Sequence, residues 1–275
     1  MPIQYQKYQD LTISNDFMFA KVMRNRKLCK KLLEIILDIE IEKIEYPEEQ
    51  KTIDITTNAR SVRLDVYVKD NQGTIYNIEI QTTNPKNLPK RCRYYQSMID
   101  LNLIEKGEDY NLLNKSYVIF ICTQDVFGYG QHIYTFENRC LENLGIRLDD
   151  GTKKIFLNPI SDMDDVREEL KNFLLYLKQG NVVDEFTMEL EKEVETAKGN
   201  REWEAEFMTL NLLLNEKLRE GLEEGRAEGR AEGRAEGKLS ILYDLVNDKV
   251  ISITEAAHRA GMTEEDFLKR MEKSY

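Results

Sequence analysis

The stretch RLDVYVKDNQGTIYNIEIQT, residues 63–82, decides the fold because apolar and polar residues alternate on both sides of a turn. A period of two is typical of a β-strand with one buried face. The tripeptide Asn71-Gln72-Gly73 suits a three-residue turn in which Gly73 takes the left-handed conformation. We therefore predict an antiparallel hairpin with one apolar and one polar face.

The predicted hairpin brings two acids together on its polar face. A turn centred on Gln72 sets Asp65 opposite Glu79, and a slip of one residue would move the apolar set to the wrong face. Like charges opposite each other are destabilising. Either the face is solvated, with Arg63 and Lys69 neutralising the acids, or the carboxylates hold a hard divalent cation such as Mg²⁺. The residues alone leave both interpretations open.

The remaining pattern mixes helices and strands. Apolar residues at helical spacing, or helix-forming composition, predict helices at 16–38, 90–105, 164–178 and 184–223. Short apolar or alternating runs predict strands at 117–122, 132–136 and 154–157.

Composition and charge exclude several classes of protein. The net charge of -11 over 275 residues argues against coating of nucleic acid by the whole surface. The only histidines are His132 and His258, and the four cysteines are scattered, which argues against a zinc site. The longest apolar run, 117–122, falls far short of the ~20 residues of a membrane span. With no stretch of signal-peptide type at the start, we expect a cytoplasmic protein without a membrane segment.

A local basic cluster follows the hairpin despite the acidic composition. Lys86, Lys90, Arg91 and Arg93 are either a phosphate-contacting edge or the solvated start of a helix. The neighbouring Tyr95 is either core or, in a recombinase-like reaction, a covalent nucleophile.

Two features mark the C-terminal region. The segment EEGRAEGRAEGRAEGK, residues 223–238, is a tetrapeptide repeat in which glycines disfavour a helix and like charges recur at i,i+4. It is either a helix completed by a partner, through a homo-oligomer of the 221–237 segment, or a flexible tether. The segment TEAAHRAGMTEEDFLKRM, residues 254–271, is either a helix-turn-helix-like binding module or a plain helical hairpin.

Several stretches together resemble one nuclease superfamily. They are DFMFAKVM (16–23), RLDVYV (63–68), YNIEIQT (76–82) and RYYQSMI (93–99), with the later strand and helix pattern to about residue 180. An acid at one strand, then E-x-Q in the next strand, then a basic and aromatic helix resembles the PD-(D/E)XK superfamily. Within it the chain resembles the branch of recombination-promoting nucleases, often labelled transposases.

The resemblance implies an α/β fold with a restriction-endonuclease-like core, a mixed central sheet flanked by helices, and a helical C-terminal extension. We expect the nuclease-like core at 1–180, a helical extension ending in the repeat at 181–237, and a small helical appendage at 238–275.

The resemblance also implies the site. Asp65 and Glu79 would be metal ligands, with the backbone carbonyl of Ile80 as a third. Gln81 would stand where many relatives have lysine, and the proline that usually precedes the first acid is replaced by leucine. Asp16 would either add an acid or simply cap the first helix. The implied cofactor is Mg²⁺, with Mn²⁺ as a substitute.

The implied activity is that of a divalent-metal-dependent DNA endonuclease that hydrolyses phosphodiester bonds and promotes recombination. The alternative is a DNA- or protein-binding factor with a degenerate nuclease core. Gln81 supports this alternative, because glutamine can orient water by hydrogen bonds but supplies no charge.

Overall fold

The computed structural model describes residues 6–46, 52–53, 62–82 and 86–273. The chain divides into two units, Met1–Phe207 and Met208–Tyr275. The expected boundaries after residues 180 and 237 stay a prediction.

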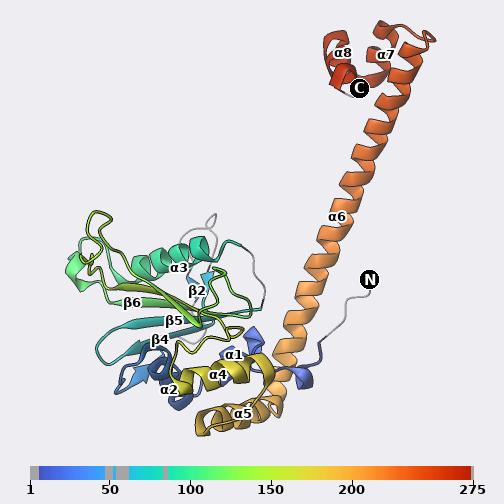
Figure 1. Ribbon diagram of the computed structural model, residues 1–275. Helices are drawn as coiled ribbons and strands as arrows, with labels where there is room; N and C mark the ends of the chain where they lie inside the picture. The colour runs from blue at the N-terminus through green and yellow to red at the C-terminus, as the bar shows by residue number, and fades with distance from the viewer. Residues whose placement is uncertain (1–5, 47–51, 54–61, 83–85, 274–275) are drawn as a thin grey trace. The chain divides into compact units, whose positions relative to one another are not determined.

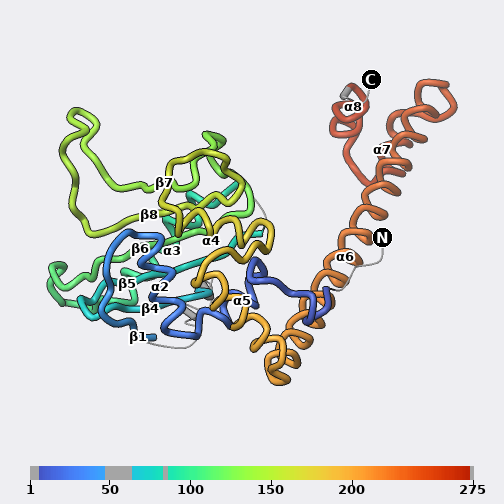
Figure 2. The backbone as a smooth tube through the Cα atoms, turned by 60° about the horizontal axis from the view of Figure 1, so that its bottom comes forward, coloured from blue at the N-terminus to red at the C-terminus, as the bar shows by residue number. Residues whose placement is uncertain are grey.

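The first unit is built on a six-stranded mixed sheet with the order β1-β4-β5-β6-β8-β7, which Figure 2 shows in succession. Strands β1, β4 and β5 pair antiparallel, β5, β6 and β8 pair parallel, and β7 runs antiparallel to β8. The strands are β1 Ile44–Glu45, β4 Val66–Asp70, β5 Ile75–Gln81, β6 Ser116–Cys122, β7 Ile133–Phe136 and β8 Thr152–Leu157. A separate two-stranded sheet joins β2 (Thr52–Ile53) to β3 (Val62–Arg63). The mixed sheet confirms the predicted α/β class.

Helices cover both faces of the sheet, α3 on one and α1, α2 and α4 on the other (Figure 1). They are α1 Asp16–Val22, α2 Arg26–Leu37, α3 Leu88–Leu103, α4 Glu168–Gln179 and α5 Glu185–Lys198, with 3₁₀ turns η1 Tyr8–Asp10 and η2 Tyr110–Leu112.

The single helix predicted at 16–38 is wrong, because Asn25 accepts hydrogen bonds from the N–H groups of Lys27 and Leu28 and so starts a second helix. Asn200 breaks the helix predicted at 184–223 in the same way.

The hairpin has the predicted register. Val66 faces Ile78 and Tyr67 faces Asn77 across β4 and β5. Gly73 has φ +88°, and a Cβ atom there would lie 2.9 Å from the side-chain nitrogen of Asn114, so the turn requires glycine. The strand starts later than expected, at Val66, because the preceding residues turn away and pair with β2.

The face of the hairpin that carries Asn77 and Glu79 is buried, so the interpretation as a solvated polar face is wrong. Both side chains are fully buried. Helix α3 packs over this face and forms one apolar cluster with β6 and β8. Its members include Leu88, Cys92, Tyr95, Ile99, Val118, Phe120 and Phe156. Glu79 on this face therefore lies under a helix rather than in water.

The second unit consists of most of helix α6 (Arg201–Asn247), from Met208 onward, with α7 (Ile253–Ala260) and α8 (Glu264–Lys273). Gly261, at φ +71°, ends α7, and the Thr263 hydroxyl accepts a hydrogen bond from the N–H of Asp266 at the start of α8. A small cluster that includes Tyr243, Ala256 and Phe267 holds the three helices together. The repeat is helical, and residues 221–238 are exposed. No helix in the described part of the chain is long and apolar enough to cross a membrane.

Candidate active site

Glu79 lies on β5, an interior strand of the sheet, and its carboxylate is held by three donors. Oε1 accepts from the backbone N–H of Asp65 and from Nδ2 of Asn77, each at 3.2 Å. Oε2 accepts from Nη2 of Arg91, also at 3.2 Å. The neighbouring strands β4 and β6 fix the backbone on both sides, so this carboxylate is rigidly placed.

Asp65 occupies the bend just before β4 and is half-buried. Burial raises the pKa of Glu79 well above its usual range, and the negative charge of Asp65 raises it further, while the Arg91 guanidinium opposes both. The two acids therefore interact electrostatically, as the hairpin register predicts.

Arg91, unlike the other three residues of the predicted basic cluster, is only partly exposed and reaches into the site. Its Nη1 donates to Oε1 of Gln81 at 2.7 Å and its Nε donates to the Tyr95 hydroxyl at 2.6 Å. A signal for this position exists in the sequence: Arg91 lies three residues after Leu88 and four before Tyr95, which places it beside the apolar stripe of α3. Lys86, Lys90 and Arg93 are exposed.

Gln81 closes the site at the end of β5. Its amide nitrogen donates to the backbone carbonyl of Ile80 at 2.9 Å, while its amide oxygen accepts from Arg91. The two carboxylates, the Ile80 carbonyl and the Gln81 amide oxygen are all hard oxygen donors, the kind that Mg²⁺ prefers. In the described residues no three His, Cys, Asp or Glu side chains gather into a metal-binding group. By their chemistry, two acids with neutral oxygens beside them are donors of the kind that suit a divalent cation whose shell water completes.

Two other predicted residues have local contacts. Asp16 begins α1, is exposed, and accepts a hydrogen bond from the N–H of Phe17 at 2.7 Å, while Asn15 is the N-cap. Tyr95 is buried, and burial, followed by the charge of Glu79, raises the pKa of its hydroxyl to about 12. A hydroxyl with a raised pKa is a poor nucleophile at neutral pH.

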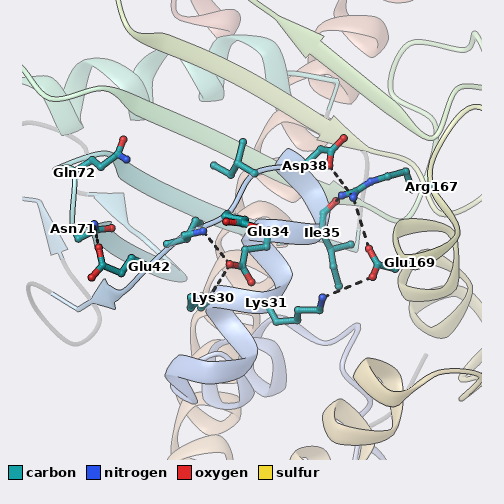
Figure 3. Close-up of a pocket in the computed structure, with 13 residues that line it drawn as sticks. Lys30, Lys31, Glu34, Ile35, Asp38, Glu42, Asn71, Gln72, Arg167 and Glu169 are labelled. Atoms are coloured by element: carbon teal, nitrogen blue, oxygen red, sulfur yellow. Dashed lines mark hydrogen bonds and ion pairs between the residues drawn. The ribbon is translucent and has the colours of Figure 1, made fainter.

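A pocket of about 830 Å³ lies elsewhere, between α2, the β4–β5 turn and the start of α4 (Figure 3). Several of its charges pair with one another: Lys30 with Glu34 at 2.8 Å, and Arg167 with Asp38 at 2.8 Å. Asp65 and Glu79 are not among its lining residues. The pocket is therefore separate from the candidate active site.

The family follows from a comparison with known families. The sequence model described as "PD-(D/E)XK nuclease family transposase" matches residues 13–207, more than half of the chain. The chain belongs to this family, which confirms the resemblance seen in its motifs. No curated protein and no solved structure matched the chain. Membership indicates a nuclease acting on DNA, in a class that generally uses divalent metal ions.

Proposed function

We propose that the chain is a divalent-metal-dependent DNA endonuclease that hydrolyses phosphodiester bonds at Asp65 and Glu79 and so promotes recombination. The observation that carries this proposal is the buried Glu79 carboxylate, whose Oε1 accepts a hydrogen bond from Asp65 within the matched region of the family. The fold gains nothing from burying Glu79 beside a second acid, because desolvation and the repulsion of Asp65 both oppose it. A divalent cation would offset that cost.

The proposed roles follow from the contacts. Asp65, Glu79 and the Ile80 carbonyl hold the cation, Mg²⁺ or its substitute Mn²⁺. The bound ion would lower the pKa of a water molecule and neutralise charge on a phosphate oxygen. Gln81, held between Arg91 and the Ile80 carbonyl, orients the attacking water. Exposed Lys86, Lys90 and Arg93 contact DNA phosphates. Asp16 remains a candidate additional acid.

Nicking of supercoiled plasmid tests the function. The wild-type protein should cleave with Mg²⁺ or Mn²⁺ and stop with EDTA. Asp65→Asn and Glu79→Gln, which remove charge with little change of shape, should each abolish cleavage. Glu42→Gln, at an exposed acid paired with Asn71, is the matched control and should cleave normally. Cleavage that persists in the Asp65→Asn, Glu79→Gln double variant would exclude this site.

The second candidate function is a DNA- or protein-binding factor with a degenerate core. The Arg91 guanidinium on Glu79 and the neutral Gln81 favour it, since the site lacks the usual lysine. Plasmid bound by the wild-type protein but never cleaved, with either metal, would support this candidate over the endonuclease.

We also propose a cytoplasmic location and a homodimer through the 221–237 repeat. All four cysteines are free thiols, which suits a reducing compartment.

In the repeat helix successive residues are about 100° apart, so rows of glycine and alanine lie on opposite sides, separated by an arginine row and a glutamate row. In a parallel pair of repeat helices, the arginine row of each helix faces the glutamate row of the other on both sides of the contact. In an antiparallel pair, arginine would face arginine and glutamate would face glutamate.

Charge reversal tests this pairing in the full-length chain. Arg226, Arg230 and Arg234 changed together to Glu should give a monomer in analytical ultracentrifugation. Changing the three adjacent glutamates Glu228, Glu232 and Glu236 to Arg in the same chain should restore the dimer. A wild-type protein that sediments as a monomer at micromolar concentration would exclude the dimer and favour a repeat that serves as a tether.

A further inference from the structure

The guanidinium group of Arg91 donates hydrogen bonds to three groups of the candidate site. Its three bonds go to the carboxylate of Glu79, the amide oxygen of Gln81 and the hydroxyl of Tyr95. They use three of its five N–H donors. The planar, delocalised group reaches two acceptors of β5 at once, which the single ammonium of lysine does less well.

The rings around Arg91 hold it in place. The guanidinium carbon lies 5.0 Å from the Tyr95 ring centre and 5.8 Å from that of Phe120. The side chain is nevertheless 33% exposed, so one edge reaches solvent. That edge leaves the guanidinium accessible to a phosphate oxygen.

The formal charges of the candidate site explain why an arginine stands at position 91. Asp65 and Glu79 bring two negative charges, and residue 81, where the resemblance implies lysine, is a neutral glutamine. Arg91 restores one positive charge at the same carboxylate and fixes the glutamine that replaced the lysine.

We propose that Arg91 supplies the positive charge of the active site from α3, in place of the lysine absent at Gln81. The inference rests on the proposed endonuclease function. It has two consequences of opposite sign. Before DNA binds, Arg91 repels the cation from Glu79 and weakens metal binding. Once a scissile phosphate reacts, Arg91 stabilises the charge that develops on its oxygens in the transition state.

Calorimetric titration of Mn²⁺ into the DNA-free full-length chain separates this role from a structural one. Arg91→Met should bind Mn²⁺ roughly tenfold more tightly, because a positive charge near the ion is gone. Arg91→Lys should bind Mn²⁺ about as the wild type does, because the charge remains. Arg93→Met removes the same charge from an exposed position of the same helix and should leave Mn²⁺ affinity unchanged.

Plasmid cleavage at saturating Mn²⁺ gives the second readout. Arg91→Met should lose about 100-fold in kcat, of the order measured when one transition-state donor is removed, with little change in KM. Arg91→Lys should recover part of that loss. Tighter metal binding together with slower cleavage is the signature of the proposed role.

Failure of the proposed role of Arg91 can be distinguished from failure of the proposed endonuclease function. Mn²⁺ affinity that is unchanged or weaker in Arg91→Met would overturn the role of Arg91 while leaving the metal site at Asp65 and Glu79 intact. If Asp65→Asn and Glu79→Gln bind Mn²⁺ as well as the wild type, the proposed function itself fails, and the role of Arg91 with it. Circular dichroism of each variant checks that the fold is retained.

Discussion

The backbone N–H of Asp65 and the carboxylate of Glu79 are joined by a hydrogen bond of 3.2 Å across the hairpin, fourteen residues apart in the chain. The bond links the bend before β4 to the interior strand β5. Any change that shifts the two strands relative to each other therefore separates the two acids.

Glu79→Gln should remove the stabilisation of the fold by Mn²⁺. An ion that binds only the folded state raises the free energy of unfolding, by about 2.7 kcal/mol at a concentration 100 times its Kd. The wild-type Tm should therefore rise with Mn²⁺ in differential scanning calorimetry, and the Tm of Glu79→Gln should stay constant. An equal rise in both proteins would place the ion elsewhere.

Gly73→Ala should destabilise the first unit by roughly 1–2 kcal/mol, because the residue has φ +88° and its Cβ would meet Asn114. Urea unfolding measures the loss. Gly128→Ala is the matched control: it has φ +76° with no neighbouring atom within 4 Å, so it should lose less. Equal losses would show that the contact with Asn114 does not matter.

Asp184→Ala should cost about 1 kcal/mol at pH 7, because Asp184 caps α5 through the N–H of Thr187 at 2.8 Å. Burial raises the pKa of Asp184, but the hydrogen bonds from Thr187 and Asn172 outweigh it and leave the pKa below its usual value. The stabilisation is thus present above the unfolded pKa of about 4 and is lost as the pH falls through the folded pKa.

Urea titrations at several pH values measure this effect. The difference between the wild type and Asp184→Ala should shrink towards acid pH. Asp184→Asn, which keeps a capping oxygen, is the control and should lose much less at pH 7. A difference that does not change with pH would show that the charge of Asp184 contributes nothing.

Tyr95→Phe should still cleave DNA. The Tyr95 hydroxyl accepts a hydrogen bond from Arg91, and its pKa is raised to about 12, so it is suited to position Arg91 rather than to attack phosphorus. We expect a loss of a few-fold in kcat in plasmid nicking. No covalent protein–DNA adduct should form with the wild type, as judged by denaturing gels. Complete inactivity of Tyr95→Phe, with an adduct in the wild type, would restore the nucleophile hypothesis.

The hairpin could be predicted because its information is local. Alternation of side chains and the turn at Gly73 fix the register of β4 and β5, and the register alone brings Asp65 near Glu79. The family resemblance added the expectation of a mixed central sheet flanked by helices, which the fold confirms.

The spacing of Arg91 from Leu88 and Tyr95 places it beside the apolar stripe of α3, but the sequence does not show which group it contacts. Whether a charged residue on a helix faces solvent or a site depends on how the helix docks, and α3 docks through contacts distant in sequence, such as Tyr95 with Phe120. Apolar spacing does not reveal the break at Asn25 for a related reason. The spacing continues through Asn25, while its capping side chain starts a new helix there.

The interior place of β5 has a consequence for the order in which the molecule comes apart. Its amides bond to β4 on one side and β6 on the other, so solvent reaches the backbone of Glu79 only when the sheet itself opens. The Glu79 carboxylate thus belongs to the segment whose amide protons should exchange last.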